Sequence, residues 1–323
     1  MTKSLVKKFL FRFRQFGGWR LVWAYWKMGV LPTLIKELAR VILQRRPLKV
    51  AYPAVARIIV PMLEEQYRPL AKELVEKHDG TNLEHEKNDV VWFCWLQGLE
   101  QAPELVKACL ASQKRWVRGK RFVIITSENY HDYVTLPADI EEKYDKGIIP
   151  DAHFTDFIRL ELLINYGGTW IDSTVLLSSG DYPDKIMDTD LFFFQYRDRK
   201  TKQFSSISNW FISAYSNNRL LMILRDMLYQ YWRDYDCLME YYVFHLFFRM
   251  IAERFPNEIE AMPKANSARA IQMALWLEKA YDAQMMEHFT NMSNFHKLDY
   301  RKSRRLTKDG KPTFYSYITE KYV

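Results

Sequence analysis

The sequence predicts an α/β protein with a mostly parallel sheet, because patterns of buried strands alternate with a helical pattern. Asp89–Trp95 (DVVWFCW) and Arg121–Thr126 (RFVIIT) are apolar runs bounded by turn residues, which is typical of parallel strands buried on both faces. Between them, Ala102–Trp116 has the pattern of a helix with Pro103 in its first turn. Strand, helix and strand at this spacing form a βαβ unit, whose ligands bind at the carboxyl ends of the strands.

The segments around this unit are predicted to be mainly helical. A polar helix is expected near residues 62–78, and most of the chain beyond about residue 217 has helical patterns. Prolines mark the expected connection and breaks, namely Pro47, Pro53 and Pro61 before the polar helix and Pro256 and Pro263 later. We therefore expect a helical extension over residues 1–80 and an α/β domain over residues 81–323.

Positive charge is concentrated at the amino terminus of this 323-residue chain. The net charge is +8, yet residues 1–49 alone hold twelve lysines and arginines against one acid, Glu37. The rest of the chain is slightly acidic and carries no motif that reads nucleic acid, so we do not expect a nucleic-acid partner. The three cysteines (Cys94, Cys109 and Cys237) form no C-x-x-C pair, which argues against a disulfide framework and favours a reducing cytosol.

Aromatic and apolar residues are interleaved with the amino-terminal charges, and they include Leu5, Phe9, Phe13, Phe16, Trp19, Trp23 and Trp26. No uncharged run approaches the roughly 18 residues that a membrane-spanning helix needs, and the features of a signal peptide are missing. Aromatic side chains at the interface and basic side chains over lipid headgroups predict contact with an anionic membrane surface. The alternative is an amphipathic helix packed on the protein's own core, with its charges solvated.

The segment Ala152–Val175 (AHFTDFIRLELLINYGGTWIDSTV) concentrates residues that are suited to binding a charged sugar donor. Asp156 and Arg159 are three apart on a predicted helix and so share a face. A Gly-Gly pair ends that helix, and a short strand then delivers Asp172, beside Ser173, at its carboxyl end. Carboxylates at this place can hold ribose or sugar hydroxyls, while the arginine neutralises a diphosphate.

Five motifs together point to a known family, because their order and spacing are more specific than any one of them. They are Trp92–Gly98 with Ala102–Pro103, Thr155–Arg159, Tyr166–Val175, Ser208–Ala214 and His296–Leu298. Over roughly residues 88–300 the sequence resembles the capsular polysaccharide synthesis glycosyltransferases, relatives of the D-x-D sugar transferases such as glucosylating bacterial toxins and yeast mannosyltransferases. The resemblance implies an A-type glycosyltransferase fold, a nucleotide-sugar donor and retention of the anomeric configuration.

The resemblance also implies roles for particular residues. It places Trp95, Gln97, Asp156, Arg159, Asp172, Ser173, His296 and Lys297 at the donor, and Asn209 with Asp172 and Arg159 at the reacting centre. Other interpretations stay open: a core position for Trp95, an ion pair on the helix for Asp156 and Arg159, a turn or cap for Asn209, and a surface pair for His296 and Lys297.

Two further expectations concern the acceptor and a metal ion. Tyr242 and His245 share a face of an apolar helix and are candidates for acceptor binding, although a histidine on such a face is more often a core residue. Thr174 replaces the second aspartate of the D-x-D signature, which in the resembling enzymes binds a divalent metal. Asp172 and His296 are the candidate ligands for Mn²⁺ or Mg²⁺, and metal dependence stays open.

The expected function is transfer of one sugar to a growing capsular or surface polysaccharide repeat, on a polyprenyl-linked or oligosaccharide acceptor. The expected location is cytoplasmic and peripheral, at the inner face of a bacterial cell membrane. The alternative is a non-catalytic protein that binds a nucleotide-sugar or a glycan.

Overall fold

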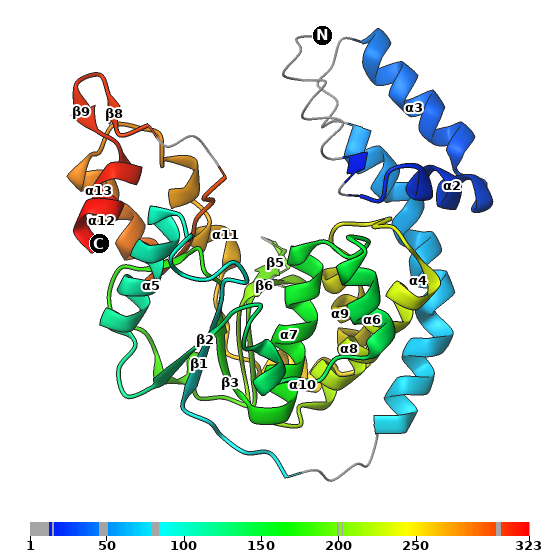
Figure 1. Cartoon of the computed structure of the whole chain (residues 1–323), viewed down its shortest axis with the longest axis horizontal. Coiled ribbons are helices and arrows are strands. Elements are labelled where there is room, and N and C mark those ends of the chain that lie inside the picture. The colour runs from blue at the N-terminus through cyan, green and yellow to red at the C-terminus, as the bar shows by residue number, and fades with distance from the viewer. Residues whose placement is uncertain are drawn as a thin grey trace. The chain divides into compact units, whose positions relative to one another are not determined.

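The computed structural model describes residues 13–14, 16–44, 51–78, 84–198, 200–201, 203–301 and 305–322 (Figure 1). The chain divides into two compact units. Unit 1 comprises Met1–Thr81, Leu136–Ile158 and Met222–Arg254, and unit 2 comprises Asn82–Thr135, Arg159–Leu221 and Phe255–Val323. Of the amino-terminal aromatic and apolar residues, Leu5 and Phe9 lie outside the described residues.

Unit 2 is built on a five-stranded sheet in the order β2-β1-β3-β6-β5. The strands are β1 (Val90–Cys94), β2 (Arg121–Ile125), β3 (Gly168–Ile171), β5 (Leu191–Arg197) and β6 (Phe204–Ala214). The β1 strand pairs in parallel with β2 and β3, whereas β6 is antiparallel to β3 and β5. All the strands except β6 therefore run in the same direction, which confirms the predicted α/β class with a mostly parallel sheet.

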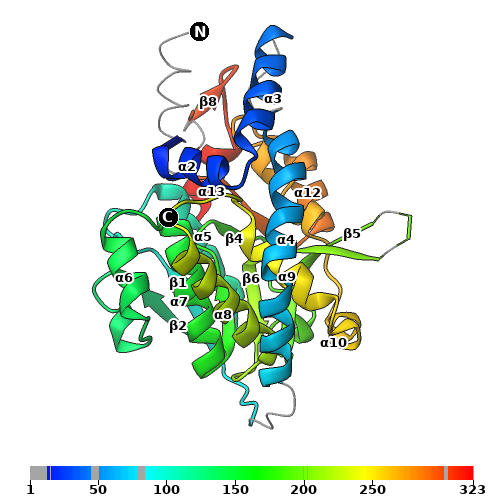
Figure 2. The same cartoon turned by 90° about the vertical axis from the view of Figure 1, so that its right-hand side faces the viewer.

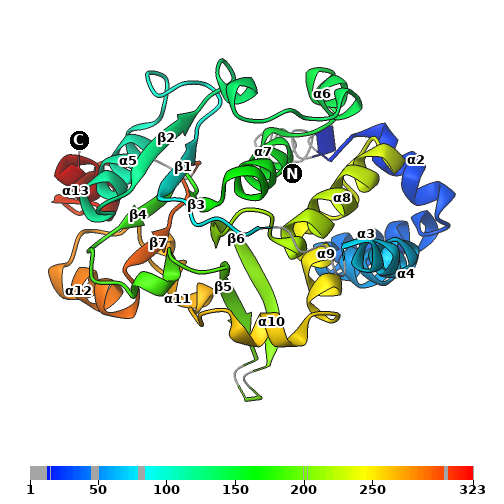
Figure 3. The same ribbon diagram turned by 90° about the horizontal axis from the view of Figure 1, so that it is seen from below.

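Helices cover both faces of this sheet, which explains why β1 is apolar at every position (Figure 3). Phe93 packs with Val106 on α5 (Glu104–Trp116) on one face. Trp92 points to the other face, where its ring contacts Tyr166 at the end of α7 (Asp151–Tyr166). Its indole N–H donates a 2.8 Å hydrogen bond to the carbonyl of Gly167.

The predicted Gly-Gly turn after α7 brings β3 against β1. Gly167 and Gly168 both have left-handed backbones, with φ of 66° and 98°. A Cβ atom on Gly168 would lie 2.5 Å from the Val90 carbonyl oxygen. Only glycine permits this approach, and the approach places the carboxyl ends of the two strands side by side.

The rest of unit 2 surrounds the sheet with short elements. The strands β4 (Val175–Leu177) and β7 (Phe295–Lys297) pair with each other in antiparallel orientation. Figure 2 shows β5 and β6 as a hairpin. The remaining elements are η2 (Tyr130–Asp132), η3 (Asp184–Ile186), α10 (Pro256–Ala261), α11 (Ser267–Ala270), η4 (Met273–Leu275), α12 (Ala283–Met292), β8 (Thr307–Lys308), β9 (Lys311–Pro312) and α13 (Phe314–Tyr322). Leu176 and Leu298 join one buried cluster with residues of α5, α12 and α13.

Unit 1 is helical. Its elements are α2 (Trp19–Lys27), α3 (Leu31–Leu43), α4 (Ala51–His78), α6 (Ala138–Asp145), most of α8 (Arg219–Asp234), α9 (Val243–Ala252) and the first half of α7. Figure 2 shows α4 beside α9, where the Tyr67 ring lies 4.9 Å from that of Phe247. The Tyr67 hydroxyl donates a 2.7 Å hydrogen bond to Asp234.

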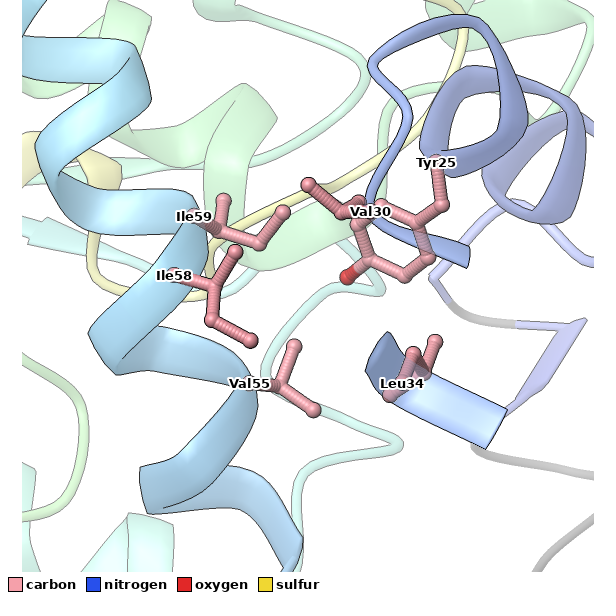
Figure 4. Close-up of a pocket in the computed structure, with 6 residues that line it drawn as sticks. All are labelled: Tyr25, Val30, Leu34, Val55, Ile58 and Ile59. Atoms are coloured by element: carbon pink, nitrogen blue, oxygen red, sulfur yellow. The ribbon is translucent and has the colours of Figure 1, made fainter. Parts of the chain in front are cut away.

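Apolar side chains of α2, α3 and α4 face one another within unit 1 (Figure 4). They line a small hollow whose wall consists of Tyr25, Val30, Leu34, Val55, Ile58 and Ile59. The Tyr25 hydroxyl donates to the carbonyl of Met239 at 3.2 Å, so α2 is also fixed to the segment that precedes α9. The amino-terminal helices are thus packed on later helices of the same unit.

The proline-based prediction of a connection before residue 62 is wrong at two of its three positions. Pro53 and Pro61 lie inside α4, whereas Pro47 lies outside the described residues. Pro53 is in the first turn, where a missing backbone N–H removes no helical hydrogen bond. An interior proline such as Pro61 costs about 3 kcal/mol. Burial of neighbouring Ile59 and Leu63 offsets that cost.

The domain boundary expected near residue 80 lies close to the end of the first segment of unit 1. That unit also includes Leu136–Ile158 and Met222–Arg254, so it is larger than the amino-terminal extension. None of the helices in the described ranges combines the length and the apolar character that a membrane-spanning helix needs. Cys94, Cys109 and Cys237 are buried and form no disulfide bond.

Replacing Gly168 by alanine should destabilise the protein more than replacing another glycine with a similar backbone. A Cβ on Gly119 (φ +72°) meets nothing within 4 Å, so Gly119→Ala pays only for its backbone conformation, about 1–2 kcal/mol. Gly168→Ala must also displace the β1 backbone, so we expect a loss of at least about 3 kcal/mol. Urea unfolding of both variants measures this difference, and equal losses would contradict the proposed strand contact.

Candidate functional site

Asp172 is held at the carboxyl end of β3 by its backbone. Its N–H donates a 2.9 Å hydrogen bond to the carbonyl of Trp210 in β6, and its carbonyl accepts from the N–H of Val175 at 3.0 Å. Gln113, on α5, donates its amide N–H to the carbonyls of Asp172 (3.2 Å) and Val175 (2.8 Å). Sequence analysis missed Gln113, whose only signal is a polar residue on the buried face of a helix.

Two basic side chains bind the carboxylate of Asp172 from opposite parts of the sequence. Arg159 donates from Nη2 to Oδ1 at 3.2 Å, and Lys297 donates from Nζ to Oδ2 at 2.6 Å. The indole N–H of Trp170 donates a second hydrogen bond to Oδ1 at 2.8 Å. The Arg159 guanidinium also lies 4.7 Å from the centre of the Trp170 ring, which adds a cation–π contact.

This cluster carries one net positive charge and is open to solvent on one side. Burial tends to raise the pKa of Asp172, but the charges of Lys297 and Arg159 and the hydrogen bonds hold that pKa below its usual range. The Arg159 side chain is 5% exposed, while those of Asp172 and Lys297 are 21% and 26% exposed. An anion that approaches from solvent therefore meets the lysine.

Trp95 lies at the same edge of the sheet, directly after β1. Its ring centre is 5.2 Å from that of Tyr300, three residues beyond Lys297. The segment from Lys297 to Tyr300 thus runs from the end of β3 to the end of β1. The buried indole N–H of Trp95 has no hydrogen-bond partner among the described residues. A buried donor without a partner at a strand end is suited to an oxygen or nitrogen of a ligand.

Other predicted donor residues occupy different environments. Gln97 is exposed in the turn after β1, and Ser173 is partly exposed next to Asp172. Asp156 is buried in unit 1, one helical turn before Arg159, with its Oδ2 4.0 Å from Nδ1 of His153. Their assignment to the donor stays a prediction.

Asn209 lies within β6, one residue before the carbonyl that accepts from Asp172. The pairing of β5 with β6 shifts here, since Phe193 pairs with Ile212 and Phe194 with Ser208. Asn209 therefore lies at an irregularity of the strand. The alternative interpretation, a turn or a cap, is wrong for this residue.

The structure separates His296 from Lys297, although the sequence grouped them. In the pairing of β7 with β4, Lys297 is opposite Val175 and His296 is opposite Leu176. Successive strand residues point to opposite faces, so His296 is directed away from the Asp172 cluster. Its Nε2 lies 3.0 Å from the Ser178 hydroxyl. His296 is fully buried, so the surface-pair interpretation is wrong for this residue.

Tyr242 and His245 lie in unit 1, at the start of α9. Their ring centres are 5.3 Å apart, so the two side chains are neighbours, but they do not share a helix face as predicted. Tyr242 is the residue before the helix and its side chain is exposed. A role in acceptor binding stays a prediction.

The side chains around Asp172 do not fit a divalent metal ion. Both carboxylate oxygens accept hydrogen bonds from cationic or indole donors, and Thr174 Oγ1 accepts from Lys297 at 2.7 Å. Mg²⁺ and Mn²⁺ need several oxygen ligands, ideally from more than one carboxylate. The described residues contain no group of three or more histidine, cysteine or acidic side chains that could hold a metal.

The geometry defines a class of protein: an α/β protein in which an acid at a strand end fixes two basic groups at the carboxyl edge of a mostly parallel sheet. Residues 40–318 match the family described as capsular polysaccharide synthesis protein. The chain belongs to this family, which confirms the resemblance seen in the sequence and extends it to part of the amino-terminal helices.

Two individual proteins share similarity with the chain. The O-glycosyltransferase PaGT of Phomopsis amygdali is 29% identical over 164 residues, which are 46% of this chain and 39% of the relative. The matched part thus spans well under half of that relative. The solved structure of the PaToxG glycosyltransferase has 13% identity and a TM-score of 0.38, over 62% of this chain and 81% of that one.

Replacing His296 should change how stability depends on pH. Burial lowers the pKa of His296 to about 3, from an ordinary 6.5. As the pH falls below 6.5, the unfolded chain binds a proton that the folded chain refuses, so stability decreases on acidification. This residue should contribute a loss of about 1.4 kcal/mol between about pH 7.5 and about pH 5.5.

Urea unfolding of the wild type and His296→Gln at both pH values checks this expectation. The variant should lose about 1.4 kcal/mol less on acidification than the wild type. His288→Gln, at an exposed histidine, is the control and should behave as the wild type does. Identical pH dependence of His296→Gln and the wild type would show that His296 is not buried as a neutral base.

Proposed function

We propose that this protein is a nucleotide-sugar-dependent glycosyltransferase that acts in capsular or surface polysaccharide synthesis. The observation that carries the proposal is the Asp172 cluster, in which Arg159 and Lys297 provide fixed positive charge at the carboxyl edge of the sheet. Diphosphates of nucleotide-sugars are the ligands that such charge suits. Membership of the capsular polysaccharide synthesis family and the similarity to an O-glycosyltransferase support sugar transfer.

In the proposed reaction the bond between the anomeric carbon and the diphosphate oxygen breaks, and a bond to the acceptor oxygen forms. Negative charge grows on the diphosphate as it leaves. Lys297 and Arg159 stabilise that charge, because they are already in place and need no rearrangement. The acceptor hydroxyl attacks from the side of the leaving group, and its proton passes to a phosphate oxygen. This course retains the anomeric configuration.

Further residues are assigned to the donor and the acceptor within this proposal. The free indole N–H of Trp95 is suited to the nucleotide base or ribose. Asp172 and Asn209 are suited to the sugar hydroxyls near the anomeric carbon. Tyr242 and His245 are the candidates for acceptor contact, and a polyprenyl-linked oligosaccharide is the proposed acceptor.

The α2 helix supports a place at a membrane surface. Trp19, Trp23 and Trp26 follow helical spacing and are 79%, 55% and 58% exposed. The rings of Trp23 and Trp26 stack at 4.8 Å, and the Lys27 ammonium lies 5.5 Å from the Trp23 ring centre. Exposed tryptophans beside basic side chains match the boundary between lipid tails and anionic headgroups. We therefore propose peripheral binding to the inner face of the cell membrane.

Arg159→Lys should reduce sugar transfer by at least about tenfold, which corresponds to about 1.4 kcal/mol of transition-state stabilisation. A lysine keeps the charge but loses the planar guanidinium that pairs with Asp172 and contacts Trp170, and so misplaces the positive charge of the cluster. Asp172→Asn should abolish transfer, because it leaves the arginine and the lysine without their shared acid. Release of nucleoside diphosphate from a panel of nucleotide-sugars measures both effects.

The matched control is Arg233→Lys, at an arginine that pairs with Asp139 at 2.8 Å on the surface of unit 1. That variant should transfer at the wild-type rate. Full activity of Asp172→Asn would refute the site. Tight binding of a nucleotide-sugar without release of nucleoside diphosphate would favour the alternative, a non-catalytic binding protein.

Removing the exposed aromatic face of α2 should release the protein from membranes. Trp19→Ser, Trp23→Ser and Trp26→Ser together should weaken binding to vesicles with phosphatidylglycerol by at least about tenfold, since apolar insertion is lost. Leu275 and Leu306, which are also exposed, give a control when both are changed to serine. Co-sedimentation measures binding, and unchanged binding of the tryptophan variant would refute the membrane role.

A further inference from the structure

The Lys297 ammonium lies between the side chains of Asp172 and Thr174, which stand at the two acidic positions of the D-x-D signature. Its Nζ is 2.6 Å from Oδ2 of Asp172 and 2.7 Å from Oγ1 of Thr174. In the enzymes that this sequence resembles, the corresponding pair of acids holds a divalent metal. Here a single ammonium group binds both side-chain oxygens, and the second acid is replaced by a neutral hydroxyl.

The backbone around Lys297 fixes the point from which its side chain extends to Asp172. The β7 strand pairs with β4, and the N–H of Leu298 donates a 2.8 Å hydrogen bond to the carbonyl of Thr174. On either side of the lysine, His296 and Leu298 are buried. Strand pairing therefore holds the backbone of Lys297 beside Asp172, and two side-chain hydrogen bonds hold its ammonium there, so the charge is organised before a ligand binds.

The hydrogen-bonding capacity of the lysine leaves room for a ligand. An ammonium group has three N–H donors. Among the described residues, Asp172 and Thr174 accept hydrogen bonds from two of these donors. With 26% of its side chain exposed, Lys297 can direct the third donor to an oxygen that arrives from solvent. A phosphate oxygen is the acceptor that best matches this exposed positive charge.

We infer that the Lys297 ammonium takes the electrostatic role of the divalent metal, so that the diphosphate of the donor binds without a metal ion. The inference rests on the proposed function, since it specifies how the same site binds its donor. The replacement of the second acid is consistent with it: Asp172 alone is shared by Lys297 and Arg159, so one net positive charge is left for the diphosphate, which a second acid would cancel. Thr174 contributes an acceptor and no charge.

The test measures the binding of UDP, GDP, ADP and CDP to the full chain by isothermal titration calorimetry, with EDTA and with Mn²⁺. We expect at least one nucleotide to bind with dissociation constants that agree within about threefold in the two conditions, because an ammonium replaces the metal. A loss of at least about tenfold in EDTA would overturn the inference and leave the proposed function intact. Failure of all four nucleotides to bind would overturn both.

Variants of the lysine provide an independent readout. Lys297→Met keeps the apolar stem and should weaken binding of the nucleotide by at least about tenfold, while Lys297→Arg should retain most of it. Lys107→Met, at an exposed lysine that pairs with Glu104 at 3.1 Å, is the matched control. Wild-type affinity in Lys297→Met would refute the role of the ammonium.

A double variant tests the exchange of lysine for metal directly. Thr174→Asp with Lys297→Met restores two acids and removes the competing cation. It should bind Mn²⁺ without nucleotide, as measured by electron paramagnetic resonance, and the wild type should not. Mn²⁺ binding of equal strength in the wild type and the double variant would overturn the inference, since the lysine would then not exclude the metal.

Discussion

The charge arrangement of unit 2 depends on one carboxylate. Asp172 pairs with the buried Arg159 guanidinium, and it also binds the Lys297 ammonium at the end of β3. Breaking a buried ion pair by removing one partner costs about 3–5 kcal/mol, because the other charge is left uncompensated. With the acid present, the two cations share it, and the surplus positive charge faces solvent. The same interaction therefore stabilises the fold locally and holds the charge that we propose to bind an anion.

Backbone geometry, more than side-chain chemistry, decides where this carboxylate lies. The close approach of β3 to β1 at Gly168 sets the position of the strand end. Gln113 from α5 and Trp210 from β6 then hold the turn from two sides. Because β1, α5 and β6 together fix the short segment that contains Asp172, the carboxylate is held in place beside the two cations.

Patterns within short segments predicted much of this arrangement. The apolar runs predicted β1 and β2, and the Gly-Gly pair predicted the end of α7. The short strand after this pair was predicted to place Asp172 at its carboxyl end, where β3 places it. Contacts between distant segments were not accessible in the same way. The packing that keeps Pro61 in a helix, and the strand register that turns His296 away from Lys297, both involve partners that no local pattern identifies. Gln113 was missed because its role depends on a strand end 59 residues later.

The late position of Lys297 also has a consequence during synthesis of the chain. The lysine is 125 residues beyond Asp172 in the sequence. At translation rates of about 5–20 residues per second, the acid is made about 6–25 s before its second cation. For that interval the nascent chain holds Asp172 and Arg159 but no Lys297. A polypeptide that terminates between residues 214 and 297 therefore contains all five strands of the sheet but lacks one of the two cations that we propose to bind phosphate.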